Sequence, residues 1–503
     1  MNASRRSFLS TALLGLPAAR IFAQSTAPAT LSIQQGETGP TIPQDFVGLS
    51  YEVQQLTDPT FFSLANHGLI AQFRALSHSG VLRLGGNTSE FAYWKPTADT
   101  QPPSAPNVKT VVGHSVAQFY PVTPQAIRNL AAFLRATGWT CLYGMNLGTN
   151  TPARAAEEAA FVAKTLGNRL QYFQIGNEVD LFDKHIRDPK TWSVKEYLKE
   201  WLAIARAIVA VVPNAKFGIP DVASKIDWLK EVATLWPTIP NPPHVTTLSH
   251  HYYFGGPATN PKVNIPALLS DKSKVIHDAK VASAAAAKMG VRVRMTEGNT
   301  CYRGGKPGVS DVFASALWAA DYALTLASFG YSGVNLHGGT GKSVANSVGG
   351  FLPGDIMLKE AGISGADIQK HPHPFYTPIA TFNGKYVAEP VSYGLRFAGL
   401  FSGATLLPVD FNPGPVNATA YAAKLPSTHL SFIVINKDAT QDLNLTLNFG
   451  KARSGVVLQE MLSAPSLEAR EAHITRSPKL PHLKDGKLIA TVPYATAIRF
   501  TLT

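Results

Sequence analysis

Two hydrophobic segments of the chain each lead to a glutamate that is flanked by small and polar residues. In residues 171–178 an apolar, aromatic run stops at Gly-Asn-Glu, which ends at Glu178, and in residues 291–297 alternating apolar positions lead to Glu297. A short apolar run bounded by glycine and polar residues is typical of a buried β-strand. We therefore expect both carboxylates to stand at the C-terminal tips of strands.

Strand patterns of this kind alternate with helical patterns through most of the chain. Thr-Pro pairs at residues 123–124 and 151–152 indicate helix starts, since threonine can cap a helix and proline suits its first turn. Ser193 and Glu196 have the spacing of a capping box. The predicted strands cover residues 46–51, 81–85, 140–146, 171–178, 216–219, 245–254, 291–297 and 333–337. Eight strands separated by helices predict an α/β fold, a (β/α)₈ TIM barrel over residues 46–402.

After the barrel the pattern changes to short strands separated by turn signals. Leucines within residues 443–447 alternate with polar residues, as half-buried antiparallel strands do. Further strands are predicted at residues 405–409, 430–435, 456–458, 488–492 and 497–502. We expect an antiparallel β-sandwich over residues 403–503, joined by a strand near Leu31 in the segment 24–45. Residues 338–374, rich in glycine, proline and histidine, predict a long loop over the barrel top.

The N-terminus has the pattern of a targeting segment. Residues 4–9 read Ser-Arg-Arg-Ser-Phe-Leu, a twin-arginine sequence, and a short apolar run and an Ala-containing cleavage pattern follow. The apolar run is too short to span a bilayer. Residues 1–23 are therefore predicted to be a twin-arginine signal peptide. The mature protein is expected to be periplasmic or secreted and not to bind a membrane.

Charge and composition exclude some classes of protein. The 503 residues carry a formal net charge of +12, but only 16% of them are charged. No run of Lys and Arg with interleaved aromatic residues occurs, so a nucleic-acid partner is not favoured, and the excess charge is interpreted as a solvated surface.

Cysteines and histidines give no sign of a cofactor. Cys141 and Cys301 cannot form a disulfide framework in a chain of this size, and no base is paired with Cys301 to make it a nucleophile. The histidine pairs in residues 250–251 and 371–373 lack a third ligand at the spacing of a metal site. We expect neither a metal nor an organic cofactor.

Paired carboxylates across a barrel mouth are what hydrolysis of a glycosidic bond with retention requires. One carboxyl protonates the leaving oxygen and later activates water, while the other attacks the anomeric carbon. The predicted strands that carry Glu178 and Glu297 lie on opposite sides of the barrel. Asn177 could hydrogen-bond the sugar 2-hydroxyl, Tyr253 could donate to the nucleophile, and His251 is expected in the wall of the site. The alternative is that both glutamates cap helices or form ion pairs.

At these residues the chain resembles the retaining glycosidases of clan A, and within the clan it is similar to glycoside hydrolase family 79, which contains β-glucuronidases and heparanase. Four motifs carry the resemblance: Gly-Asn-Glu at 176–178, His-His-Tyr-Tyr at 250–253, Arg-Leu-Gly-Gly-Asn at 83–87, and Cys-Tyr-Arg-Gly-Gly-Lys at 301–306. The resemblance spans the predicted mature chain, because that family also has a barrel and a β-sandwich built partly from the N-terminus.

The resemblance implies a role for each matching residue. Glu178 corresponds to the acid/base and Glu297 to the nucleophile. The other matches are expected to bind the sugar: Asn87 and Asn177 at its hydroxyl groups, Tyr253 beside the nucleophile, and Tyr302, Gly304, Lys306 and Tyr376 around a uronate carboxylate. A tyrosine hydroxyl, main-chain N–H groups and a lysine are suitable partners for such an anion.

The expected function is that of a retaining β-glucuronidase. It would release terminal β-linked glucuronic acid, with the 4-O-methylated sugar as one form, from glycans or glycosides by double displacement. The alternatives are an endo-acting, heparanase-like hydrolase, a clan A glycosidase for a neutral sugar, and a non-catalytic carbohydrate-binding protein. Two intact glutamates at strand tips argue against the last.

Overall fold

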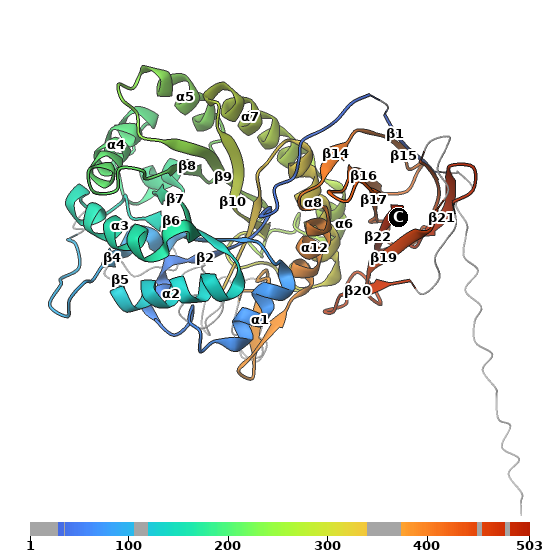
Figure 1. Ribbon diagram of the computed structural model, residues 1–503, viewed down its shortest axis with the longest axis horizontal. Coiled ribbons are helices and arrows are strands. Elements are labelled where there is room, and N and C mark those ends of the chain that lie inside the picture. Colours follow the sequence, from blue (N-terminus) through green and yellow to red (C-terminus); the bar gives the residue numbers. More distant parts are fainter. Residues whose placement is uncertain are drawn as a thin grey trace, which may run out of the picture.

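The computed structural model describes residues 29–34, 36–104, 119–339, 374–449, 455–477 and 483–502. The predicted signal peptide and nearly all of the predicted loop at 338–374 lie outside the described residues, so both stay predictions. The described chain consists of a barrel and, beside it, a smaller unit of sheets (Figure 1).

The larger unit is a closed barrel of eight strands, in which every neighbouring pair is parallel. Around the barrel the strands follow the order β10, β11, β2, β3, β6, β7, β8, β9. Their bounds are β2 (Val47–Glu52), β3 (Val81–Gly85), β6 (Thr140–Met145), β7 (Leu170–Ile175), β8 (Phe217–Val222), β9 (Val245–Gly255), β10 (Arg292–Cys301) and β11 (Val334–Gly338). The predicted (β/α)₈ barrel is confirmed. Because all strands run the same way, their C-terminal ends form one mouth.

Helices cover the outside of the barrel (Figure 1). The α-helices are α1 (His67–Leu76), α2 (Pro124–Thr137), α3 (Pro152–Leu166), α4 (Val194–Val211), α5 (Asp227–Leu235), α6 (Ile265–Ser270), α7 (Ser273–Met289), α8 (Phe313–Ser328) and α12 (Pro390–Ala398). Short 3₁₀ helices are η1 (Val53–Thr57), η2 (Asn87–Phe91), η3 (Gly167–Arg169), η4 (Val179–Lys184), η5 (Trp236–Thr238) and η6 (Gly399–Phe401). Thr123, Thr151 and Ser193 cap α2, α3 and α4 through their side chains, so these predicted helix starts are confirmed.

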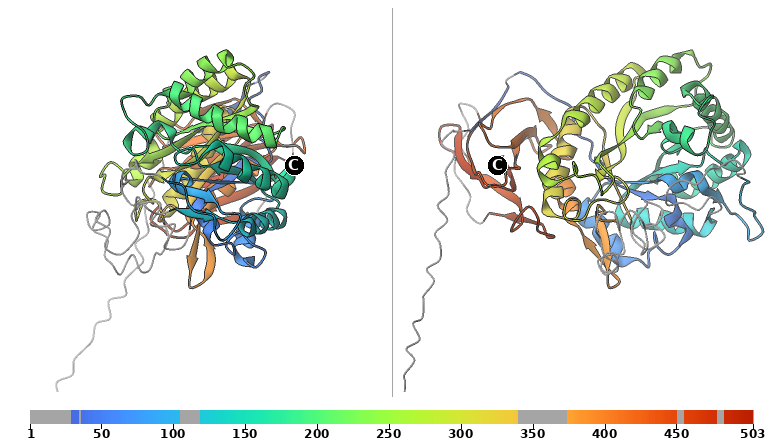
Figure 2. Two further views of the ribbon diagram at one scale, coloured as in Figure 1. Left: turned by 90° about the vertical axis from the view of Figure 1, so that its left-hand side faces the viewer. Right: turned by 180° about the vertical axis from the view of Figure 1, so that it is seen from behind.

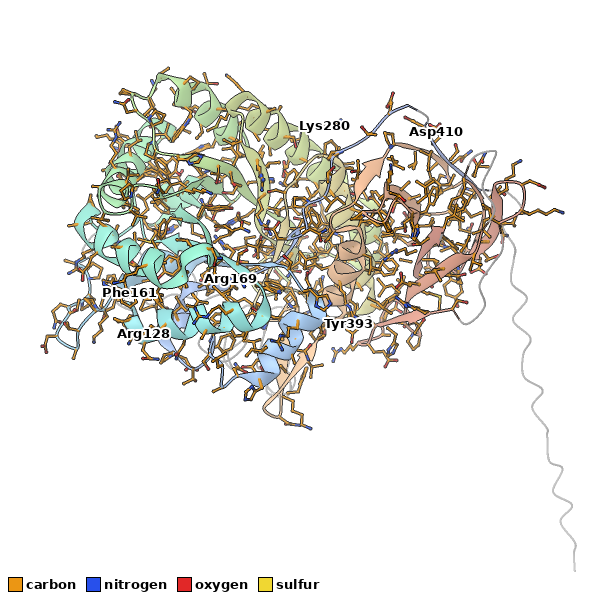
Figure 3. All side chains as sticks on the ribbon, in the orientation of Figure 1. Arg128, Phe161, Arg169, Lys280, Tyr393 and Asp410 are labelled. Carbon is orange, nitrogen blue, oxygen red and sulfur yellow. The ribbon has the colours of Figure 1, made fainter. Side chains whose placement is uncertain are left out.

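Neighbouring helices also contact each other through cationic side chains on the outer surface. The Arg128 guanidinium of α2 lies 6.0 Å from the ring centre of Phe161 on α3 (Figure 3). The Arg128 side chain thus lies over a partly buried aromatic ring on the outside of the barrel.

The smaller unit contains two sheets. One has the order β15-β1-β18-β21 and the other β14-β16-β17-β22-β19-β20. The bounds are β1 (Ala29–Ile33), β14 (Thr405–Leu407), β15 (Val409–Asn412), β16 (Ala418–Lys424), β17 (Leu430–Asn436), β18 (Leu443–Asn448), β19 (Val457–Ser463), β20 (His473–Arg476), β21 (Lys487–Val492) and β22 (Thr496–Leu502). Apolar side chains of both sheets form one core between them, as in a β-sandwich.

The sandwich differs from the prediction in two details. The N-terminal strand β1 joins it as expected, but it pairs parallel with β18 and antiparallel with β15. No hairpin links β1 to β18, so chain direction is not constrained there. The strands β16 and β20 and most of β15 were not predicted. In the case of β16 the reason is that it is mostly alanine, which is a poor strand signal.

Two short pairs of strands complete the described chain. They are β4 (Ala92–Trp94) with β5 (Tyr120–Val122), and β12 (Ile379–Phe382) with β13 (Lys385–Ala388). No helix in the described part of the chain is long and apolar enough to cross a bilayer.

The barrel and the sandwich share an interface built on α8 and α12 (Figures 1 and 2). Every residue of α8 except Ser328 is buried, as expected for a helix packed on all sides. Asp321 of α8 accepts from Lys437 of the sandwich at 2.7 Å and pairs with Lys272 at 2.6 Å. Burial alone would raise the pKa of Asp321, but the two lysines hold it below its ordinary value. The charged cluster thus ties the sandwich to one side of the barrel.

Candidate active site

Glu178 lies in the tight turn between β7 and η4. Its φ of 50° is in the left-handed region, which residues other than glycine seldom adopt outside functional sites and turns. The Glu178 N–H donates to the main-chain oxygen of Asp221 at 2.8 Å. Gly176 opens the turn with a φ of 86°, and a Cβ there would lie 2.6 Å from the Val179 side chain. The Gly-Asn-Glu motif therefore turns the chain directly after β7, so that Glu178 lies at the barrel mouth.

Glu297 lies within β10 and is 6% exposed. The pairing register with β9 shifts between Met295 and Glu297, and such irregularities commonly redirect a side chain beside an active site. The Glu297 Oε1 atom accepts from the Tyr253 hydroxyl at 2.8 Å, and Oε2 accepts from Arg83 Nη1 at 2.5 Å. His337 Nδ1 lies 3.6 Å from Oε2. Both carboxylate oxygens are therefore held by donors or cations.

The two glutamates face each other across the mouth. A carboxylate oxygen of Glu178, one of Glu297 and a ring nitrogen of His251 all lie within 4.8 Å of one another. His251 Nδ1 is 3.0 Å from Glu178 Oε1 and 4.0 Å from Glu297 Oε1. A metal fits this cluster poorly, because the His251 ring nitrogens both face carboxylates and the Glu297 oxygens already have donors.

The surroundings change the pKa values of the Glu178 and Glu297 carboxyls in opposite directions. Burial raises the pKa of Glu178 above its ordinary value, against the opposing hydrogen bond and charge of His251. Burial would also raise the pKa of Glu297, but the charges of His337, His251 and Arg83 lower it to about 2. A proton is thus held more readily by Glu178, while Glu297 stays ionised, and such a division separates an acid from a nucleophile.

Several residues that order the site were not assigned roles from the sequence. Arg83 is fully buried in β3 and donates from Nη2 to Asn177 Oδ1 at 2.6 Å and to Asp221 Oδ2 at 2.7 Å. An arginine inside an otherwise apolar strand is a signal for a buried ion pair. That signal was present in the Arg-Leu-Gly-Gly-Asn motif, but it does not reveal the partners. His337, at the end of β11, was likewise missed.

Asn177 is fixed from three directions. Its main-chain N–H donates to Glu90 Oε1 at 2.7 Å, its Oδ1 accepts from Arg83, and its Nδ2 donates to Asn87 Oδ1 at 3.3 Å. Glu90 also accepts from the main-chain N–H of Leu147. Burial raises the pKa of Glu90 to about 7 in spite of these donors. The structure therefore brings Asn87 and Asn177 together beside Glu178, as expected for residues of one sugar site.

Three of the four residues expected around a uronate carboxylate cluster near Tyr253. Tyr302 is 39% exposed and its ring packs edge-on against Tyr253, with 6.4 Å between centroids. The Tyr376 ring lies 6.1 Å from that of Tyr253, and the Tyr376 N–H donates to the Gly304 main-chain oxygen at 3.3 Å. The two tyrosine rings therefore lie against the residue that donates to Glu297.

Lys306 is placed differently. Its ammonium donates to the main-chain oxygens of Asn260 at 3.1 Å and Val263 at 2.8 Å, in the segment that follows β9. The amine therefore braces that segment against the loop after β10. Its expected contact with a substrate carboxylate stays a prediction. That contact would have to use an N–H of the ammonium other than the two that bond Asn260 and Val263.

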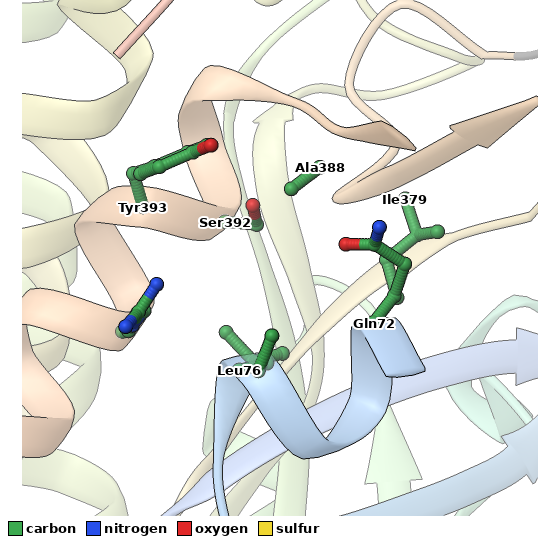
Figure 4. Close-up of a pocket in the computed structure, with 8 residues that line it drawn as sticks. Gln72, Leu76, Ile379, Ala388, Ser392 and Tyr393 are labelled. Carbon is green, nitrogen blue, oxygen red and sulfur yellow. The ribbon is translucent and has the colours of Figure 1, made fainter. Parts of the chain in front are cut away.

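Two cavities lie away from the glutamates. One of about 80 Å³ is bordered by α1, β12, β13 and α12 (Figure 4). Another, of about 480 Å³, is lined by residues at the N-terminal ends of barrel strands, among them Thr140, Tyr172 and Arg294. That end of a TIM barrel generally contributes stability, and catalysis occurs at the opposite end. Neither cavity is lined by a residue expected to bind the substrate.

Comparison with curated proteins finds two relatives named β-glucuronidase. One, from Aspergillus niger, is 27% identical over 281 residues, which are 52% of this chain and 51% of that protein. The other, from Neurospora crassa, is 24% identical over 363 residues, which are 64% of this chain and 62% of that protein. The chain thus spans about half to three fifths of the length of the curated relatives it matches. No protein-family model matches the chain.

Solved structures share the fold over nearly the whole chain. A 4-O-α-L-rhamnosyl-β-D-glucuronidase from Fusarium oxysporum has a TM-score of 0.70 at 17% identity, covering 94% of this chain and 100% of that one. A GH51 arabinofuranosidase from Xanthomonas axonopodis pv. citri has a TM-score of 0.66 at 13% identity, covering 95% and 100%. At such identities these structures establish the fold alone. Together with the two curated relatives, they confirm the predicted resemblance of this chain to β-glucuronidases with a TIM barrel.

Proposed function

We propose that the protein is a retaining β-glucuronidase, a glycoside hydrolase that releases terminal β-linked glucuronic acid from glycans or glycosides. The observation that carries the proposal is the pair Glu178 and Glu297, with carboxylate oxygens within 4.8 Å and surroundings that favour opposite protonation states. Retaining glycosidases hold their two carboxyl groups about 5–5.5 Å apart, whereas inverting enzymes leave room for a water between them.

In the first step of this mechanism the Glu297 carboxylate attacks the anomeric carbon as the bond to the leaving oxygen breaks. Glu178 gives its proton to that oxygen, and the sugar becomes an ester of Glu297. In the second step Glu178, now ionised, takes a proton from water, which attacks the same carbon and frees Glu297. The bonds from Arg83 and Tyr253 keep the Glu297 carboxylate in one orientation through both steps.

Selection of a uronide is supported by Tyr302 and Tyr376, whose rings pack against Tyr253, by the bond of the Tyr376 N–H to the Gly304 main chain, and by the β-glucuronidase relatives. Tyrosine hydroxyls and main-chain N–H groups that converge on an anion bind it more strongly than they bind a neutral group. We infer that these residues receive the C5 carboxylate, whether the 4-hydroxyl is free or methylated. Membership of glycoside hydrolase family 79 is part of the same proposal.

Cellular location and domain limits belong to the proposal as well. Residues 1–23 are inferred to be a twin-arginine signal, residues 24–45 a segment that contributes to the sandwich, 46–402 the catalytic barrel and 403–503 the sandwich. Replacing Arg5 and Arg6 by lysine should leave the protein in the cytoplasm, and unchanged export of that double variant would contradict the twin-arginine route.

The test of the function is hydrolysis of four aryl glycosides, namely β-glucuronide, β-glucoside, β-xyloside and α-arabinofuranoside. The β-glucuronide should have the largest kcat/KM, and NMR should show the β-anomer of glucuronic acid as the first product. Preference for a neutral glycoside would replace the proposal by the neutral-sugar alternative, and an α-anomer formed first would contradict retention. Failure to cleave any of the four would favour endo action or carbohydrate binding without catalysis.

A further inference from the structure

Asp221 is a fully buried carboxylate at the C-terminal end of β8, between the strands that carry the two glutamates. Its φ of 64° is left-handed, like that of Glu178. Its main-chain oxygen accepts from the Glu178 N–H at 2.8 Å. Its side chain reaches the same residue indirectly, since Oδ2 lies 3.2 Å from His251 Nε2 and His251 Nδ1 lies 3.0 Å from Glu178 Oε1.

The contacts of Asp221 determine which ring nitrogens of His251 are protonated. Asp221 Oδ2 lies 2.7 Å from Arg83 Nη2, so the carboxylate is ionised, and its Oδ1 accepts from the Thr296 hydroxyl. An ionised carboxylate can only accept, and therefore the ring nitrogen that faces it must carry a proton. The other ring nitrogen faces Glu178, which is likewise an acceptor whenever it is ionised. His251 is then a cation that donates at both nitrogens.

A second cation beside His251 makes Asp221 necessary for that state. Arg83 Nη2 and His251 Nε2 are only 3.4 Å apart, and two like charges at that distance repel unless an anion lies between them. Asp221 Oδ2 is within hydrogen-bonding distance of both. The Asp221 carboxylate therefore pairs with both cations. The other ring nitrogen of His251, Nδ1, is left to donate to Glu178.

We propose that Asp221 is the positioning residue of the acid/base: its main-chain oxygen fixes the Glu178 backbone, and its carboxylate keeps His251 a doubly protonated donor to the Glu178 carboxyl. The inference rests on the proposed role of Glu178. It concerns the second step of the proposed mechanism, in which ionised Glu178 accepts a proton from water. A cationic donor stabilises that ionised carboxylate and so lowers the pKa of Glu178.

Other charged groups around His251 are consistent with this assignment. Glu297 lies 4.0 Å away on β10, Glu178 follows β7, and Arg83 lies on β3. The preceding residue on β9, His250, is neutral, since burial lowers its pKa to about 3. Burial also works against a charged His251, but Asp221 and Glu297 outweigh it and raise the pKa of His251 to about 10. Asp180 also raises the proton affinity of Glu178 and belongs to η4.

Asp221→Asn should remove the negative charge beside His251 while keeping the shape of the side chain. Without the anion, His251 gives up a proton near neutral pH and Glu178 loses a cationic donor, so the pKa of Glu178 rises. The basic limb of kcat/KM should move to higher pH by about one unit. For an aryl glucuronide with an activated leaving group, kcat should fall more than kcat/KM, because the step that needs ionised Glu178 is the second one.

The deciding experiment is NMR of the full chain with ¹⁵N-labelled histidine side chains, which needs no substrate. His251→Gln assigns the His251 signals by their disappearance. In the wild type at pH 8 both His251 nitrogens should have protonated shifts, and Asp221→Asn should convert one of them to an unprotonated nitrogen. Asp180→Asn is the matched control, because Asp180 is equally buried but bonds main-chain N–H groups of residues 223–225 and not His251.

Each outcome decides the assignment. A neutral His251 in the wild type at pH 8 overturns it even if Asp221→Asn does not fold, and so does a doubly protonated His251 in the Asp221→Asn protein. A protonated wild-type ring that becomes neutral only in Asp221→Asn supports it. Inactivity of the wild type toward every glycoside would contradict the proposed function instead, and the NMR result would still decide what Asp221 does to His251.

Discussion

Glu297 and Glu178 are carried by different kinds of backbone. Glu297 lies within β10, paired on both sides in the barrel, and its side chain is 7% exposed. Glu178 lies in a turn after β7 with left-handed backbone angles, and its side chain is 17% exposed. The proposed nucleophile must return to the same atom position in both steps, so a strand and two donors suit it. An acid/base must exchange protons with the leaving group and with water, which requires access.

The partners of the two glutamates differ in the same way. Arg83 and Tyr253 donate to both oxygens of Glu297, whereas His251 contacts one oxygen of Glu178. The charges of His337, His251 and Arg83 keep Glu297 ionised, whereas Glu178 meets a single donor and desolvation lets it hold a proton. Desolvation would raise the pKa of both carboxyls, so the cations and donors around each of them decide which one holds a proton.

Removal of the nucleophilic charge is the largest change. Glu297→Gln should lower kcat/KM for every substrate by roughly a thousandfold or more, because an amide cannot form the glycosyl ester. The measurement is steady-state hydrolysis of an aryl β-glucuronide. Glu158→Gln is the control, since Glu158 is also a buried carboxylate bonded to a tyrosine but lies on α3. Near-wild-type turnover by Glu297→Gln would refute its role.

Removal of the acid/base should discriminate between leaving groups. Glu178→Ala should lower kcat/KM for a phenyl glucuronide by about a hundredfold or more, because that oxygen needs a proton as it departs. A dinitrophenyl leaving group needs little protonation, so its kcat/KM should change much less. Equal losses for both substrates would mean that Glu178 does not act as the acid.

Loss of the Arg83 charge should reduce the difference in pKa between the Glu178 and Glu297 carboxyls. The pKa of Glu297 is lowered by its cationic neighbours, so Arg83→Met should raise it, and the acidic limb of kcat/KM should move to higher pH. Activity should fall by about a hundredfold at neutral pH, because one oxygen of the nucleophile also loses its donor. Arg83→Lys keeps a charge but not the planar fork, so its acidic limb should move less. An unchanged limb in Arg83→Met would contradict the assigned cause.

The smallest expected effect concerns the uronate. Tyr302→Phe should reduce the preference for β-glucuronide over β-glucoside by about tenfold, chiefly through weaker turnover of the glucuronide, since a hydrogen bond to a charged group contributes about 1.5–3 kcal/mol. Tyr393→Phe on α12, at the cavity of Figure 4, is the control. If the ratio of the two kcat/KM values is the same in Tyr302→Phe and wild type, Tyr302 does not bind the carboxylate.

The barrel and the position of both glutamates at its mouth were predictable because their signals are local. An apolar run that leads to Gly-Asn-Glu, or an alternating run that leads to Thr-Glu-Gly-Asn, contains its own evidence within ten residues. The prediction that Glu297 stands at a strand tip was wrong, because pairing with β9 continues to Cys301 and places Glu297 within β10. The capped starts of α2, α3 and α4 were predictable for the same reason. Strand β16 was not, because its alanines gain their preference for a strand from neighbours in the sheet.

The network under the glutamates could not be predicted in this way. Arg83 and Asp221 are 138 residues apart in sequence, and Arg83 and His251 are 168 apart, so no local pattern joins them. Lys306 shows the converse case. Its motif suggested a substrate contact, but the fold brings two main-chain oxygens within reach of its amine. Long side chains bind whatever acceptor the tertiary structure places nearby.

In the proposed mechanism Glu297 forms the covalent bond to the sugar while Glu178 transfers protons. The most direct test is to incubate the protein with 2-deoxy-2-fluoro-β-glucuronosyl fluoride, which slows the second step, and to locate the label by mass spectrometry of peptides. We expect one label per chain, on Glu297, and none in the Glu297→Gln variant. A label on Glu178 or any other residue would contradict the division of roles, and so would full hydrolysis of this reagent by Glu297→Gln.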